Sequence, residues 1–226
     1  MSWITDNPPS EVLFSGPATT QAAGAATAGW VQVAGAVTTI QNLVQGATGA
    51  SGGVDFVQPV IPAGFWKPGR QNQLIKITAT GIVSWVATAA TTATWSFGVT
   101  TQAQFAATGA AAGTPITLIT SQVFPNQTTA QTNAPWRFDI DLLAKQVGFG
   151  NTAISTSILA TGVGGFSPAV VGATGAIAPW GPMPPNVTTT VDASINNYVW
   201  AAITFGTNAS ASNTCTMLRM DVHGCN

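Results

Sequence analysis

The chain has 226 residues, enough for one large β domain or for a domain preceded by an arm. Hydrophobic residues make up 46% of it but charged residues only 6%, against roughly 25% in an ordinary soluble domain. The net charge of -1 excludes the basic patch that nucleic-acid binding requires. A surface with so little electrostatic repulsion suits a protein that works inside an assembly.

Neither a membrane anchor nor a secretion signal is expected. Thr, Gly and Gln interrupt the apolar stretches well before the ~20 residues of a spanning helix. The first residues, from Met1 to Pro9, lack the basic start and the apolar run of a signal peptide. We therefore expect no membrane partner, and release from a cell only by lysis or another route.

Residues 1–54 differ from the rest, and we expect them to form an extended arm that ends in a Gly-rich linker. Leu13 and Phe14 belong to a short apolar plug between prolines and glycines. The stretch 30–44 fits either one helical face or a strand. Residues 46–53 are typical of a flexible linker. Because the arm has too few periodic apolar positions for a core of its own, we expect it to dock on a partner.

A compact domain is expected over residues 55–226, and its clearest element is the segment 136–142. Large apolar residues at the even positions from Trp136 to Leu142 alternate with Arg137, Asp139 and Asp141. This period of two predicts a central strand with one face in the core and three charged side chains in water.

Eight further strands are expected around this one, since short apolar runs recur between Gly- and Pro-containing turns. In chain order they are 56–61, 73–85, 93–99, 116–119, 153–160, 188–191, 198–205 and 215–222. The Gly- and Pro-rich stretch 162–185 is expected to be a long loop, and Gly81 to mark a bulge. The pattern predicts an all-β fold, an antiparallel jelly-roll β-sandwich preceded by the arm.

The eight tryptophans fall into two groups. Four lie in expected strands and are assigned to the core, whereas the others lie in the arm or in Gly/Pro segments. Exposed aromatic residues flanked by flexible chain are typical anchors for a partner, although such residues can equally cap the domain's own core. The candidate partner interface consists of Trp3, Leu13, Phe14, Trp30, Trp66 and Trp180.

Few residues suggest catalysis or metal binding. Asp139 and Asp141 share one face at a spacing that fits the ~5 to 9 Å between the carboxylates of a glycosidase. The chain has few clustered polar residues to hold a sugar there, so we interpret both as structural. Asp192 and Asp221 complete no recognisable cation loop, and His223 has no partner residue. We therefore predict no catalytic residue, no metal site and no cofactor.

The two cysteines, Cys215 and Cys225, are ten residues apart. On one extended strand that spacing is ~33 Å, far beyond the reach of a disulfide, although a turn between them would alter this. We expect two unpaired thiols.

Three segments resemble tailed-phage virion proteins that contain a jelly roll. They are Pro62–Arg70, Pro135–Leu142, and Val191–Tyr198 with the later Ser212–Thr214. In those proteins a jelly roll follows an N-terminal arm and the chain ends in a short Asn-terminated strand, as Gly224-Cys225-Asn226 does here.

This resemblance covers roughly residues 55–226 and has no catalytic signature. It implies a non-enzymatic capsid decoration or minor capsid protein, a homotrimer on the capsid exterior of a virion assembled in the host cytoplasm. Its partners would be copies of itself and the major capsid protein or other virion proteins. A tail-associated jelly-roll protein that binds a receptor or a carbohydrate would have a similar sequence, and this alternative stays open.

Overall fold

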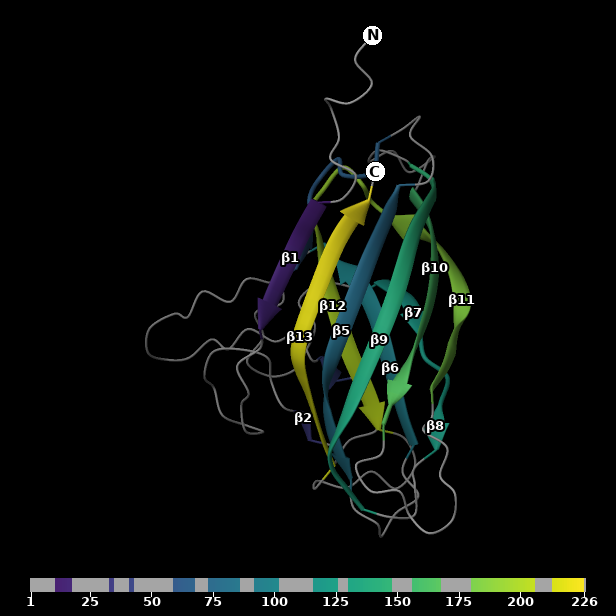
Figure 1. Ribbon diagram of the computed structural model, residues 1–226. Coiled ribbons are helices and arrows are strands. Elements are labelled where there is room, and N and C mark those ends of the chain that lie inside the picture. The colour runs from purple at the N-terminus through teal and green to yellow at the C-terminus, as the bar shows by residue number, and fades with distance from the viewer. Residues whose placement is uncertain are drawn as a thin grey trace.

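The computed structural model of this chain is all-β (Figure 1). It describes residues 11–17, 33–34, 41–42, 59–67, 73–85, 92–101, 116–125, 130–147, 156–167, 180–205 and 213–225. Within these ranges all elements of regular secondary structure are strands, and all the strand pairs are antiparallel. The expected all-β class is confirmed.

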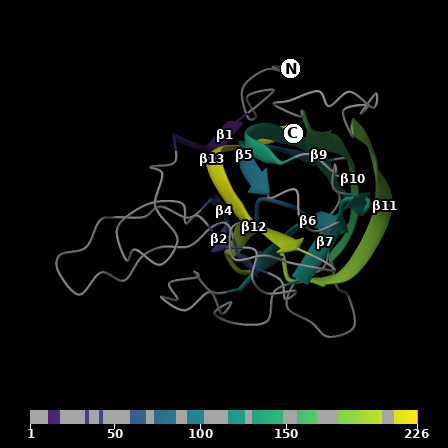
Figure 2. The same cartoon turned by 90° about the horizontal axis from the view of Figure 1, so that it is seen from below.

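Two sheets face each other in a sandwich-like arrangement (Figure 2). The first has the order β1 (Glu11–Pro17), β13 (Thr214–Cys225), β5 (Leu74–Trp85), β9 (Gln131–Gln146), β10 (Thr156–Phe166) and β11 (Trp180–Val191), with β2 (Val33–Ala34) also on β13. The second has the order β3 (Gln41–Asn42), β12 (Asn197–Phe205), β6 (Thr92–Thr100) and β7 (Ile116–Thr120), with β4 (Val60–Ile61) on β12 and β8 (Phe124–Pro125) on β6.

The segment 136–142 lies inside β9, with β5 on one side and β10 on the other. Its apolar residues are buried, and Arg137 and Asp141 between them are exposed. The prediction that the side chains of this strand alternate between core and water is therefore confirmed. The same alternation places Phe138 between the two sheets. Phe138 packs its ring 5.3 Å from Phe97 and 5.4 Å from Trp95, which both come from the opposite sheet. Side chains from the inner faces of both sheets thus form one core.

The stretch 162–185 is not the long loop that its composition predicts. Residues 162–166 continue β10, and β11 begins at Trp180. Gly164 is required in β10 because a Cβ there would lie 2.2 Å from Cδ1 of Phe138. The prolines of β11 are tolerated because this strand is at the end of its sheet, where a missing N–H breaks no ladder bond on the outer side.

Gly81 lies at a register shift, in keeping with the bulge expected there, but the extra residue is on the neighbouring strand. The register shift opposite it lies in β13, between Met217 and Arg219. A Cβ on Gly81 would lie 2.1 Å from the carbonyl oxygen of Thr216 and 2.5 Å from the Trp136 ring. This glycine therefore permits the close approach of a neighbouring strand and a core indole.

Three short strands fall within residues 1–54, where an arm is expected. β1 pairs with β13, β2 pairs with β13, and β3 pairs with β12. Each of these stretches is therefore a strand of one of the two sheets. The remaining residues of 1–54, including the expected linker, lie outside the described ranges.

One side of the sandwich is closed by β11, which lies beside β7 of the other sheet (Figure 2). Asn186 Nδ2 of β11 donates to the Leu118 carbonyl of β7 at 2.8 Å, and Thr188 Oγ1 donates to the Thr117 carbonyl at 3.4 Å. These side chains thus bond to main-chain carbonyl groups of the opposite sheet. The contact couples the two sheets and fixes β11 in place.

Candidate functional site

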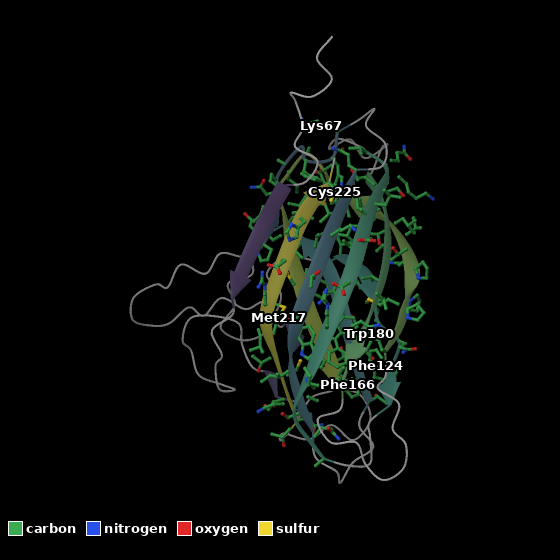
Figure 3. All side chains as sticks on the ribbon, viewed as in Figure 1. Lys67, Phe124, Phe166, Trp180, Met217 and Cys225 are labelled. Carbon is green, nitrogen blue, oxygen red and sulfur yellow. The ribbon has the colours of Figure 1, made fainter. Side chains whose placement is uncertain are left out.

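Charge is concentrated on the outer face of the larger sheet, the face seen in Figure 3. Seven of the thirteen charged residues lie on β13, β5 and β9, at positions whose side chains alternate with the buried ones. They are Lys76, Arg137, Asp139, Asp141, Lys145, Arg219 and Asp221. The charged face that the alternation around Trp136 predicts is thus wider than β9 alone.

Asp139 is held by two neighbours. Its Oδ2 and Oδ1 accept hydrogen bonds from Arg137 Nε at 2.8 Å and Nη2 at 2.9 Å. The Thr78 hydroxyl on β5 donates to Oδ1 at 2.8 Å. Partial burial raises the pKa of Asp139, but the hydrogen bonds from Arg137 and Thr78 and the Arg137 charge outweigh it, so the pKa lies below its usual value. Asp139 therefore stays ionised at neutral pH, which does not suit a general acid.

A second ion pair repeats this arrangement on β13. Arg219 Nε donates to Asp221 Oδ2 at 2.7 Å, again between residues two apart on one strand. Strand pairing sets Asp221 opposite Thr78 and Thr78 opposite Asp139, so the two carboxylates lie in one row across the sheet. Both arginines are largely exposed, so the pairs contribute little to stability, but they neutralise this row.

A groove of about 480 Å³ lies on this face, over β5, β9 and β10. Its side-chain walls come from Lys76, Thr78, Asp139, Asp141, Thr161 and Val163, with Ile77, Ile140 and Gly162 beneath. The register sets Lys76 and Thr161 on either side of Asp141. Lys76 and Asp141 are both exposed, and within the described residues neither makes a hydrogen bond or an ion pair. The groove therefore presents one unengaged cation and one unengaged carboxylate.

An apolar strip runs along the outer side of the β10–β11 hairpin. Trp180 is 50% exposed, Val187 48% and Val163 37%, and Pro182 is exposed opposite Val163. We call these four residues the hairpin strip. The register pairs Trp180 with Gly165, the residue before the buried Phe166.

The six residues of the candidate partner interface have different places in the structure. Trp180 is exposed, as expected of an anchor, although it begins a strand. Trp66 is buried with 1% exposure, so it is no surface anchor and the prediction for this residue is wrong. Leu13 and Phe14 lie in β1, whose backbone pairs with β13. Trp3 and Trp30 lie outside the described residues.

Trp66 is buried because distant segments fold the 59–67 stretch onto the domain. The Gly64 amide donates to the Ala193 carbonyl, and the Val199 amide donates to the Pro59 carbonyl, both at 2.8 Å. Beyond the turn, Gln73 Nε2 donates to the Phe65 carbonyl at 3.0 Å. Trp66 therefore fits the alternative that a turn tryptophan caps the domain's own core.

The exposed valines of the hairpin strip were missed by sequence reasoning. Val163 falls in the stretch that composition predicts to be a loop, and Val187 lies one residue before the strand expected at 188–191. A local signal existed only in Trp180, a large aromatic residue between Pro179 and Gly181.

The two cysteines both lie on β13, ten residues apart, and both are free thiols. Cys215 is buried, and burial raises the pKa of its thiol far above the usual range. The indole N–H groups of Trp95 and Trp136 act on this pKa in the opposite direction but only partly offset burial. Cys215 is therefore a core residue without nucleophilic character.

In comparisons with known proteins, no family model, no curated protein and no solved structure matches this chain. The resemblance to tailed-phage virion proteins stays a prediction. Among the residues that the structure describes, no helix is long and apolar enough to cross a membrane.

Proposed function

We propose that this chain is a non-enzymatic structural component of a phage virion, which decorates or cements the capsid exterior as a homotrimer. The observation that carries the proposal is the hairpin strip, where Trp180, Val163 and Val187 are exposed along the outer side of the β10–β11 hairpin, on a chain with very few charges. Apolar area exposed to water raises the free energy of the protein, and that free energy falls when another protein covers the area. Its partners are other copies of this chain and the major capsid protein or other virion proteins.

The strand pairs support a jelly roll as the finer description of the sandwich. A jelly roll is a long folded hairpin in which strand 1 pairs with 8, 2 with 7, 3 with 6 and 4 with 5. The pairs β1–β13, β4–β12, β5–β9 and β6–β7 follow this scheme. The β10–β11 hairpin is then an addition between strands 6 and 7. The exposed apolar residues of the strip all lie on this addition, which suits an element kept for contact with a partner.

In this jelly roll β1 is the first strand, so the domain that we propose begins before residue 55. Removal of residues 1–54 would then delete β1 together with β2 and β3. The truncated chain is expected to unfold at lower urea concentration than the full chain, or not to fold. A truncated chain with the full stability of the intact one would show that residues 1–54 are a separable arm and would contradict the eight-strand scheme.

The state of Asp139 supports a non-enzymatic role. A two-carboxylate glycosidase needs one carboxyl group with a raised pKa to protonate the leaving group. Asp139 has a lowered pKa and is occupied by Arg137 and Thr78. Asp139 is therefore not the acid of such a pair, and both of its oxygens are already engaged.

A tail-associated jelly-roll protein that binds a receptor or a carbohydrate is the second candidate. One observation favours it, namely the polar groove beside Lys76 and Asp141 on the outer face of the larger sheet. Copy number separates the two candidates, since a decoration protein is present in many copies per particle and a tail protein in few.

Light scattering of the isolated protein tests the oligomer and the strip together. The wild-type protein at micromolar concentration is expected at about three times 22.9 kDa. Two substitutions in the strip, Trp180→Asp and Val187→Asp, should shift the mass toward that of one chain. Ile195→Asp is the matched control, because Ile195 is 38% exposed but lies in the turn after β11, outside the strip. A wild-type protein that stays monomeric at high concentration would contradict the oligomer.

A further inference from the structure

The groove on the outer face contains a cross-strand pair of charged residues whose side chains bond to no other residue that the structure describes on this face. Lys76 on β5 and Asp141 on β9 are directly opposite in the register and exposed. The other aspartates of the face, Asp139 and Asp221, each accept a hydrogen bond from an arginine two residues earlier on the same strand. Lys76 and Asp141 thus keep their donor and acceptor capacity for a ligand, in a chain with only thirteen charged residues.

The neighbours of this pair exclude several classes of ligand. A divalent cation would find one available carboxylate, Asp141, with the Lys76 ammonium opposite it, because Asp139 is already bound by Arg137 and Thr78. A phosphate or another anion would meet the Asp141 carboxylate opposite the single unengaged ammonium, because the Arg137 guanidinium is already bound to Asp139. A peptide strand would find no main-chain groups to pair with, because β9 lies between β5 and β10 and pairs with both.

A neutral ligand with several hydroxyl groups is the class that these neighbours do not exclude. Each sugar hydroxyl both donates and accepts, so one hydroxyl can donate to Asp141 while its neighbour accepts from Lys76. The Thr161 hydroxyl lies on the other side of Asp141 and can take either role. Val163, which is 37% exposed, offers an apolar wall for the C–H side of a sugar ring. The volume of about 480 Å³ falls within the roughly 300–1,000 Å³ of small-molecule sites.

We propose that this groove is a carbohydrate-binding site, in which Asp141 and Lys76 together hold vicinal hydroxyls of a neutral sugar ring. The site lies on the outer face of the larger sheet and shares Val163 with the hairpin strip, so a partner copy that covers the strip would also cover this wall of the groove. Since the groove is open and none of its lining residues is aromatic, we expect one site to bind a monosaccharide weakly. Binding to a glycan surface gains from several copies acting at once.

Saturation-transfer difference NMR on the full chain tests the site. The probes are the methyl glycosides of glucose, galactose, mannose, rhamnose and N-acetylglucosamine at millimolar concentration. At least one of them should receive saturation from the wild-type protein. Asp141→Ala and Lys76→Ala should each weaken that binding about ten-fold, whereas the control Lys145→Ala should not, because Lys145 is on the same strand face but outside the groove.

Urea unfolding of each variant shows whether the fold is retained. If one variant is destabilised, Thr161→Val provides a third substitution in the groove wall and should also weaken binding. Absence of saturation transfer to all five glycosides would overturn the proposal. So would binding that is unchanged in the groove variants, or a groove that binds calcium or inorganic phosphate in a manner abolished by Asp141→Ala or Lys76→Ala.

Discussion

Replacement of Phe138 by alanine tests how the two sheets are held together. Phe138 is fully buried on β9, and its ring centroid lies 5.3 to 6.3 Å from those of Phe97, Trp95, Trp136 and Phe124. A buried Phe→Ala substitution costs about 3–5 kcal/mol in the free energy of unfolding. Aromatic pairs contribute roughly 0.5–1.5 kcal/mol each beyond burial, which places this site at the upper end, near 5 kcal/mol. At about 2–4 °C per kcal/mol for a chain of this size, Tm should fall by roughly 10–20 °C.

Urea unfolding followed by tryptophan fluorescence measures this loss, with all variants at one protein concentration because association adds to apparent stability. Ile195→Ala is the control, since Ile195 is 38% exposed in the turn after β11, outside the hairpin strip, and its truncation should change the free energy by less than about 0.5 kcal/mol. A loss below about 2 kcal/mol for Phe138→Ala, with an unchanged m-value, would refute the assignment of Phe138 to a tightly packed centre between the sheets.

Three further predictions concern individual positions. Gly164→Ala should destabilise the protein by about 1–3 kcal/mol in urea unfolding, because the new Cβ would lie 2.2 Å from the Phe138 ring, and a variant as stable as wild type would contradict this packing. The lowered pKa of Asp139 stabilises the fold above the ordinary carboxyl pKa of 3.8, and this contribution is lost as pH falls through the lower value in the folded state. Since Asp139 is partly exposed, Asp139→Asn should remove less than about 1 kcal/mol of this acid-dependent stability. Equal acid dependence of the unfolding free energy in the wild type and in this variant would argue against the Arg137 and Thr78 contacts. In the native protein a thiol reagent should modify Cys225 and leave Cys215 unmodified until urea unfolds the chain, so rapid modification of both would show that Cys215 is accessible.

The strands that sequence predicts well are those whose burial is decided by their own alternation. β9 alternates in this way over most of its length, whereas β6 is buried on both faces from Trp95 onward and the alternation of β13 holds only after the register shift between Met217 and Arg219. The outer parts of β10 and β11, residues 162–166 and 180–185, were missed because their composition indicates a loop. The reasons for that composition lie in residues that are distant in the chain. Gly164 is needed beneath Phe138, and Pro182, Pro184 and Pro185 are tolerated because β11 ends its sheet.

The same distinction applies to the functional surfaces. The charged face follows from the alternation around Trp136, and the Arg137–Asp139 ion pair joins residues two apart on one strand. The opposition of Lys76 and Asp141 depends on the register between β5 and β9, which no local pattern reveals. Trp66 has the flanking Pro and Gly residues of an exposed turn, yet hydrogen bonds to residues such as Ala193 fold that turn onto the core.

The most direct test of the proposed function is the number of copies of this chain in purified phage particles, measured by quantitative mass spectrometry against the major capsid protein. The account predicts a copy number of the same order as that of the major capsid protein, as expected for a trimer that decorates the shell. A handful of copies per particle would favour the tail-associated alternative. Absence of the chain from particles that are otherwise complete would contradict a structural role in the virion.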